Sequence, residues 1–449
     1  MSRLREDQRI SRLREDQRMS RLREDQRMSR LREDQRMSSS REDQQAQARV
    51  AQVTRDSYGR LLAVLAAPTR DIAAAEDALA DALERALARW PDDGIPANPE
   101  GWLLTVARNR LRDVWKSSGY RMTEQLNEID YASTPLEDDM SAIPDRRLEL
   151  MLVCAHPAIA PNIRTPLMLQ SVLGVEAAAI ATAFAVEPAT MAQRLVRAKK
   201  RIRDAGIPFV LPQRDDLAER LPAVLEAVYG AYAIDWQLAP QGAPIESLSA
   251  EALHLALVLA ELLPDEPEVL GLAALVCMSE ARRPARRSAD GGFIPLDEQD
   301  TRLWDEVLIA RGEALLRHAH DCRRPGRFQY EAAIQSAHCT RATRGKVDVT
   351  ALRKLHRALL RVAPSLGAAV ASAAVDGEID GPDAGLRALD AIDDPAVERF
   401  QPAWTTRAHL LAEAGRAAEA CDAYRGAIEL TADPAVAEYL LRRLQSMTC

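Results

Sequence analysis

Apolar residues recur every three or four positions along most of the chain, which is the spacing of one face of a helix. From Arg49 onward the sequence is rich in Ala, Leu, Arg and Glu in this pattern. Runs of Val, Ile and Thr that alternate at every second position are absent, so no strands are predicted. We therefore predict an all-α fold.

The clearest predicted helix covers 71–90. Asp71 is placed to cap its amino end, and Pro91 and Gly94 are expected to end it. Its expected buried face consists of apolar residues at helical spacing: Ile72, Leu79, Leu83, Leu87 and Trp90. Another face is acidic and carries Asp77, Asp81 and Glu84. Taken alone, this acidic face is also typical of an ordinary solvated helix.

The next helix is predicted to begin at Pro99, after the capping residue Asn98. Four apolar residues are spaced to face the core: Leu103, Ala107, Leu111 and Val114. The outer face combines three basic residues with an aromatic one: Arg108, Arg112, Lys116 and Trp115. Basic and aromatic side chains together suit the binding of unstacked bases. An amphipathic helix with solvated arginines would show the same pattern.

A short turn at 186–188 precedes a strongly basic helix. Between Ala181 and Gly206 there are six Lys or Arg and two acids, a local charge of +4. Four residues are expected to face the core: Met191, Leu195, Ala198 and Ile202. Six are expected to point outward: Thr190, Gln193, Arg194, Arg197, Lys200 and Arg201. A short turn before such a helix fits a DNA major groove, although a basic solvated helix is the alternative.

Beyond Gly206 the pattern predicts a long helical array, with helices over 221–232, 247–263, 267–280 and 303–319. Near the carboxyl end, seven residues match the spacing of a tetratricopeptide repeat: Trp404, Ala408, Leu411, Gly415, Ala420, Tyr424 and Ala427. A weaker repeat covers 366–397, with a turn at Asp380 and Gly381. Such repeats form a protein-binding groove or serve as a structural cap.

A four-residue motif, Asp290-Gly291-Gly292-Phe293, interrupts this array. It predicts a turn, because glycine tolerates a positive φ. A phenylalanine directly after a turn can anchor the loop in a pocket. A plain loop between two helices is the alternative.

The first 45 residues differ from the rest of the chain, because they repeat a nine-residue unit, SRLREDQRM, four times before degrading. Nine residues turn a helix by about 900°, half a turn out of register. The repeated leucines then alternate between opposite faces, so we expect a disordered tail or a marginal solvated helix. Translation that begins at Met37 instead of Met1 is an open alternative.

Charge and composition exclude several classes of protein. The net charge of −8 divides into +3 in the first 45 residues and −11 in the remainder, which argues against nonspecific coating of nucleic acid. The chain has no apolar run of about 18 residues and no apolar leader, so we expect a cytoplasmic protein with no membrane contact. Cys154 and His156 lack further ligands nearby, so no metal or cofactor is expected.

Three segments together resemble a bacterial RNA polymerase sigma factor of the extracytoplasmic-function type. AEDALADALERAL over 75–87 is similar to the polymerase-binding helix of sigma domain 2, and WLLTVARNRLRDVWK over 102–116 is similar to the helix that follows it. IATAFAVEPATMAQRLVRAKKRIR over 180–203 resembles the helix-turn-helix of sigma domain 4. The chain also resembles a subgroup with a long helical extension, through segments such as LPDEPEVLGLAAL at 263–275 and DGGF at 290–293.

The resemblance implies partners and site residues. The partners are the β′ and β subunits of core RNA polymerase and promoter DNA in duplex and melted form. A protein that binds the carboxyl-terminal repeats is a further possible partner, which the repeat pattern suggests. Core polymerase would contact Glu76, Asp77, Asp81 and Glu84. The −10 element would contact Arg108, Asn109, Arg112, Trp115 and Lys116. The −35 element would contact Thr190, Gln193, Arg194, Arg197, Lys200 and Arg201, and the 290–293 loop would be regulatory.

The implied domains are a tail at 1–45, sigma domain 2 at 46–116, a linker at 117–145, sigma domain 4 at 146–206, a helical extension at 207–345 and tetratricopeptide-like repeats at 346–449. Three alternatives are an ordinary helix-turn-helix regulator, a repeat scaffold and an enzyme. Co-purification with core polymerase separates a sigma factor from the regulator. No acid-base pair or nucleophile stands out in the sequence, so an enzyme is not predicted.

Overall fold

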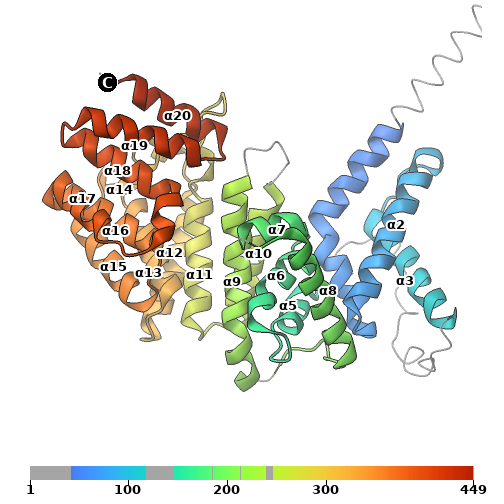
Figure 1. Cartoon of the computed structure of the whole chain (residues 1–449). Coiled ribbons are helices and arrows are strands. Elements are labelled where there is room, and N and C mark those ends of the chain that lie inside the picture. Colours follow the sequence, from blue (N-terminus) through green and yellow to red (C-terminus); the bar gives the residue numbers. More distant parts are fainter. Residues whose placement is uncertain (1–41, 118–144, 185, 213, 239–245, 448–449) are drawn as a thin grey trace, which may run out of the picture. The chain divides into compact units, whose positions relative to one another are not determined.

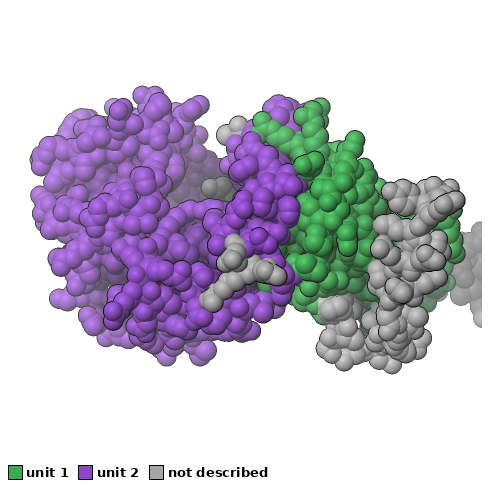
Figure 2. Space-filling model, turned by 90° about the horizontal axis from the view of Figure 1, so that it is seen from below, with its two compact units in different colours: residues 1–153, 193–210 green, residues 154–192, 211–449 purple. Residues whose placement is uncertain are grey.

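The computed structural model describes residues 42–117, 145–184, 186–212, 214–238 and 246–447. Most of the predicted tail and of the predicted linker lies outside these residues. The described chain is helical, apart from a β-bridge between Arg287 and Phe293. The chain divides into two compact units, residues 1–153 with 193–210 and residues 154–192 with 211–449 (Figure 2). The all-α prediction is confirmed.

The first unit contains a helix over 42–69, which includes residues 42–45 that we had assigned to the tail. It is followed by α2 (Ile72–Asp93), α3 (Pro99–Ser117), most of α5 (Arg147–Cys154) and most of α8 (Pro188–Asp204). Leu61, Leu62 and Leu65 are buried in its core. Trp90 of α2 and Trp102 of α3 meet edge to face, with ring centroids 5.6 Å apart. This contact joins the carboxyl end of α2 to the amino end of α3.

Both predicted amino-terminal caps are confirmed. Asp71 Oδ1 accepts a hydrogen bond from Ala74 N at 3.1 Å, and Asn98 Oδ1 accepts one from Gly101 N at 2.9 Å. A cap satisfies a backbone N–H that has no partner inside the helix, which is why Asp and Asn at these positions define where α2 and α3 begin.

The carboxyl end and the buried face of α2 differ from the prediction. Pro91 lies inside α2, and the helix ends at Gly94, which has a φ of 84°. The buried face is built mainly on alanines, with Ala75, Ala78, Ala82 and Ala86 beside Ile72, Leu79 and Trp90. Leu87 is 43% exposed, and Val114 of α3 is 39% exposed. Small side chains therefore let α2 pack closely, and the larger Leu87 is left at the surface.

The second unit begins with α6 (Pro161–Ser171) and α7 (Ala177–Ala183) and continues as a helical array (Figure 1). The helices pack mostly on helices one or two positions away along the chain. The array comprises α9 (Arg214–Leu238), α10 (Glu246–Leu262), α11 (Pro267–Glu280), α12 (Glu306–Asp321), α13 (Arg327–Cys339), α14 (Arg341–Arg344), α15 (Val349–Val362), α16 (Leu366–Asp380), α17 (Pro382–Asp390), α18 (Gln401–Glu413), α19 (Ala417–Leu430) and α20 (Pro434–Gln445).

Helix α11 is the centre of the first half of this array. It packs against α9, α10, α12 and α13, and every residue from Pro267 to Ser279 except Glu268 is buried. A helix that is apolar on all sides is stable only when neighbours surround it. Its bounds agree with the predicted range.

The predicted repeat positions lie in two helix pairs, α16 with α17 and α18 with α19. The turns contain Gly381 with a φ of 92° and Gly415 with a φ of 75°. Five of the seven residues at repeat positions are buried: Ala408, Leu411, Ala420, Tyr424 and Ala427. Assignment of these pairs to tetratricopeptide repeats remains a prediction.

Gly271 allows α11 to approach α13. A Cβ at this position would lie 2.7 Å from the backbone nitrogen of Gln329, so one of the two helices would have to move. We expect Gly271→Ala to destabilise the second unit by about 1–3 kcal/mol, the range typical of overpacking. Thermal unfolding of the full chain measures this loss.

Gly230 of α9 is the matched control, because its Cβ would meet only Leu169 Cδ2 at 4.0 Å. Gly230→Ala adds a methyl group at ordinary contact distance and improves helix propensity by about 0.5–1 kcal/mol. Equal midpoints for the two alanine variants would show that α11 and α13 are not tightly packed at Gly271.

Candidate functional site

Helix α8 presents a basic outer face. Its inner residues Met191, Leu195, Ala198 and Ile202 are buried, as predicted. The six predicted outward residues are all exposed: Thr190, Gln193, Arg194, Arg197, Lys200 and Arg201. At the start of the helix the Glu187 carboxylate accepts a hydrogen bond from Thr190 N at 2.8 Å, which lowers the pKa of Glu187. The exposed guanidinium and amide groups of this face can donate hydrogen bonds to phosphates and base edges.

Lys199 is buried on another side of α8, and its ionic contact was not predicted. Its Nζ lies 2.6 Å from Glu76 Oε2 and 2.7 Å from Glu76 Oε1 of α2. The two side chains are only 8% and 20% exposed. Both belong to the first compact unit. A cation from the helix predicted to bind DNA is therefore neutralised by an acid predicted to bind polymerase.

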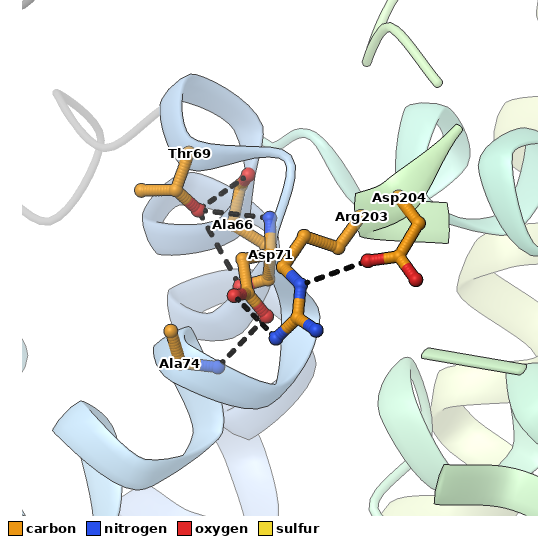
Figure 3. A network of polar contacts seen from close by, with 6 residues as sticks. All are labelled: Ala66, Thr69, Asp71, Ala74, Arg203 and Asp204. Atoms are coloured by element: carbon orange, nitrogen blue, oxygen red, sulfur yellow. Dashed lines mark hydrogen bonds and ion pairs between the residues drawn. The ribbon is translucent and has the colours of Figure 1, made fainter. Parts of the chain in front are cut away.

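A second ionic contact joins the same two helices at the start of α2. Arg203 Nη1 lies 3.5 Å from Asp71 Oδ2, and Arg203 Nε donates to Asp204 at 3.3 Å (Figure 3). Asp71 raises the pKa of Arg203. The same Asp71 carboxylate accepts a hydrogen bond from Ala74 N and so caps α2. One side chain therefore fixes the start of α2 and also contacts α8.

Backbone carbonyls complete the attachment of α8 and the chain that follows it. Arg70 Nη1 donates to Gly206 O at 3.2 Å, and Arg146 Nη2 donates to Phe209 O at 3.1 Å. Arg70 has a φ of 55°, which is unusual for a residue with a side chain. Together with Lys199 and Arg203, these bonds hold α8 and residues 205–210 within the first unit.

The predicted acidic residues of α2 do not form one uniform surface. Glu76 is paired with Lys199, and Asp81 Oδ2 lies 2.7 Å from Arg110 Nε of α3. Asp77 and Glu84 are exposed. The charge that α2 presents to solvent is therefore smaller than its sequence indicates.

The basic and aromatic face of α3 occupies the last turns of that helix. Arg112 and Lys116 are exposed, whereas Arg108 and Trp115 are partly buried. Exposed Asn109 accepts a hydrogen bond through Oδ1 from Arg112 Nη1 at 3.0 Å. The arrangement brings cations, an amide and an indole ring to one end of a helix.

The loop at 290–293 is the tight turn that the sequence predicts. Gly291 has a φ of 87° and donates through its N–H to Ser288 O at 2.9 Å. Ser288 N in turn donates to Gly292 O at 2.9 Å. Exposed Asp290 is close to Ser288, whose hydroxyl lowers the pKa of the Asp290 carboxyl. Only glycine adopts the backbone angle of Gly291 without strain.

Two contacts fix this loop to α20. The Phe293 ring meets the Tyr439 ring edge to face, with centroids 5.6 Å apart. Arg287 Nη2 lies 2.6 Å from Asp433 Oδ2, and Asp433 caps α20 through Ala435 N. The sequence predicted that Phe293 anchors the loop, but it did not reveal Tyr439 or Asp433, because about 140 residues separate them from the loop.

No helix in the described part of the chain is long and apolar enough to span a membrane.

Comparison with known proteins identifies two segments and one relative. Residues 54–120 match the sigma-70 region 2 family, and residues 220–320 match a family of unknown function, DUF6596. An uncharacterized protein of Rhizobium meliloti (strain 1021), R00370, is 34% identical over 389 residues, which cover 84% of this chain and 91% of the relative. No solved structure matches. The chain therefore belongs to one family with the Rhizobium protein, and its sigma-70 region 2 supports the role of a sigma factor in transcription initiation.

Proposed function

We propose that this protein is a sigma factor of the extracytoplasmic-function type, which binds core RNA polymerase and directs it to specific promoters. The observation that carries the proposal is the sigma-70 region 2 match at 54–120, which includes all of α2 and α3. The basic helix α8 follows this region and presents six exposed polar or basic side chains. Duplex DNA and polymerase are the partners that these surfaces suit.

In this proposal α2 contacts core polymerase through Glu76, Asp77, Asp81 and Glu84. The end of α3 contacts the melted −10 strand through Arg108, Asn109, Arg112, Trp115 and Lys116. Unpaired bases expose ring faces that stack on an indole, and arginines nearby neutralise phosphates. Helix α8 contacts the −35 duplex, where phosphate contacts supply affinity and base-edge contacts supply specificity. Promoter melting then uses binding energy and involves no covalent chemistry.

In the described arrangement the Glu76–Lys199 ion pair holds α8 against α2, and we call this arrangement the closed form. Glu76 cannot contact polymerase while Lys199 neutralises it, and the docked side of α8 is occupied by α2. We therefore propose that polymerase binding displaces α8 from α2. Charged groups from polymerase would replace Lys199 beside Glu76, since an unpaired carboxylate at a half-buried position is costly.

The carboxyl-terminal extension is proposed to regulate this activity in cis. The 290–293 loop is its regulatory element, because Phe293 and Arg287 connect the loop to α20. A protein that binds the repeats at 346–449 would affect the loop through α20, because α20 belongs to this region and contacts the loop segment. Both activation and inhibition are compatible with this connection.

Run-off transcription tests the proposed function directly. Purified full-length protein is added to core polymerase and genomic DNA fragments, and the products are sequenced. Discrete transcripts that depend on the protein support the proposal. If transcripts do not change and core polymerase does not co-purify with the protein, an ordinary DNA-binding regulator is the better description.

Arg194 and Arg197 are expected to be important for promoter binding, because both are exposed on α8. Replacing both with Ala should weaken binding of the holoenzyme to a promoter found by run-off transcription by about 2–5 kcal/mol, if one contacts a base and the other a phosphate. Fluorescence anisotropy at fixed salt measures this loss. Arg317→Ala with Arg425→Ala is the control, since both arginines are exposed on other helices. Equal binding by the two double variants would remove α8 from the promoter interface.

The Glu76–Lys199 pair is expected to stabilise the docking of α8. A double-mutant cycle with Lys199→Met and Glu76→Gln should give a coupling energy of about 1–3 kcal/mol in denaturant unfolding. Lys199→Met should also increase hydrogen exchange of α8 amides and tighten binding to core polymerase, because it opens the closed form while leaving Glu76 in place.

The exposed pair of Arg425 and Asp422 on α19 is the matched control for this cycle, and its coupling energy should be about 0–1 kcal/mol. Additive effects of the Lys199 and Glu76 variants would show that the pair does not hold α8. If Lys199→Met increases hydrogen exchange of α8 but does not tighten binding to core polymerase, the proposed displacement of α8 from α2 is contradicted.

A further inference from the structure

A cavity of about 520 Å³ lies inside the second unit, within the size range of small-molecule sites. Its walls come from α9, α11, α13 and the segment 293–299, which follows the Gly291 turn. Tyr229, Tyr232 and Phe293 contribute aromatic rings to the lining. Most lining residues fall within 220–320, the region that matches a family of unknown function.

Two arginines line this cavity. Arg282 is only 7% exposed, and its guanidinium donates from Nε to Met278 O at 3.3 Å and from Nη2 to Gln335 Oε1. Both of these acceptors are uncharged. Arg286 Nη2 donates to Tyr232 Oη at 2.7 Å and to Ser279 O at 2.6 Å. The Arg282 guanidinium also lies 6.0 Å from the centroid of the Trp304 ring. A buried cation is stable when an anion accompanies it, and the partners of Arg282 among the described residues are all neutral.

The acidic and imidazole groups of the lining do not supply that anion. Glu331 Oε1 lies 2.8 Å from Arg327 Nε, so its charge is already compensated by another residue. Burial, with help from Arg282, lowers the pKa of His338 to about 4, so His338 is neutral near pH 7. The cavity therefore retains a positive character.

Gln299 provides an independent sign of a ligand. Its side chain is buried, with 9% of the residue exposed, and its Nε2 donates to Ile294 O at 3.4 Å. Its Oε1 is buried and accepts no hydrogen bond from any described residue. An unsatisfied buried acceptor is rare in proteins and costs free energy. Gln299 lines the cavity, so a rotation of its side-chain amide would let this oxygen accept a hydrogen bond from a ligand hydroxyl.

We propose that this cavity binds a small aromatic carboxylate that bears a hydroxyl group. The carboxylate pairs with Arg282, whose planar guanidinium suits a carboxylate. The aromatic ring packs among Tyr229, Tyr232 and Phe293, and the hydroxyl donates to Gln299 Oε1. Each part of the ligand matches one feature of the lining. The carboxylate matches the uncompensated charge, the ring matches the aromatic side chains, and the hydroxyl matches the unsatisfied acceptor.

Binding at this cavity would reach the 290–293 loop directly. Phe293 lines the cavity and also contacts Tyr439 of α20. Gln299 is connected to the same segment through Ile294 O, and its own carbonyl accepts from Arg341 Nη2 at 2.6 Å. The binding proposal does not rest on the proposed transcription function, because it concerns only the second unit.

Isothermal titration of the full-length protein tests the proposal with three probes: 4-hydroxyphenylacetate, phenylacetate and 4-hydroxyphenylacetamide. We expect the hydroxy acid to bind with one-to-one stoichiometry and at least tenfold more tightly than the amide, which has no charge for Arg282. We expect it to bind about fivefold to tenfold more tightly than phenylacetate, the advantage of one buried neutral hydrogen bond.

Gln299→Leu removes the unsatisfied acceptor and nearly preserves side-chain volume. In this variant the advantage of the hydroxy acid over phenylacetate should disappear, while phenylacetate itself binds as before. Gln445→Leu, at an exposed position of α20, is the control and should change neither affinity. Arg282→Lys, checked for native helix content, should reduce the preference for acid over amide. The absence of saturable binding by the hydroxy acid, equal affinity of acid and amide, or an unchanged hydroxyl advantage in Gln299→Leu would overturn the proposal.

Discussion

The ion pair between Lys199 and Glu76 is the contact on which the first unit depends. Moving an ammonium and a carboxylate away from water costs free energy, which their mutual attraction offsets only at short distance and with good geometry. Here both Glu76 oxygens lie within 2.7 Å of the Lys199 Nζ. The pair is therefore specific in position, because a small shift of α8 along α2 would break the short contact between two largely buried charges.

Under the proposed function, this constraint favours a switch between docked and displaced α8 over a gradual shift of the helix. Asp71 caps α2 and pairs with Arg203, so its carboxylate keeps one partner when α8 leaves. Glu76 and Lys199 each lose their short ionic contact at the same moment, and a new charged partner must replace it. A cationic group of polymerase beside Glu76 and a DNA phosphate beside Lys199 would replace the two sides of the pair.

The local features of the fold were predictable, and the long-range ones were not. The caps at Asp71 and Asn98, the bounds of α11 and the turn at Gly291 follow from residues within four positions of each other. The outward face of α8 follows from helical periodicity alone. By contrast, Glu76 and Lys199 are 123 residues apart, and nothing near either residue indicates the other. Pro91 misled the prediction, because α2 continues for two residues beyond it although proline lacks the N–H of one helical hydrogen bond.

The two buried cations, Lys199 and Arg282, show how the partner of a charge decides its role. Lys199 has an internal carboxylate, so the folded chain satisfies it and a change of partner requires helices to separate. Arg282 has a carbonyl, an amide oxygen and the ring of Trp304 as partners, none of which carries a negative charge, so a molecule from solution can supply one. Gln299, whose amide oxygen is also unsatisfied among the described residues, lines the same cavity. A chain under selection for stability alone would be expected to fill such a site with apolar side chains, as it does along α11. A buried cation without a described carboxylate partner and an unsatisfied amide oxygen, beside aromatic rings, are the features that the proposed ligand site uses.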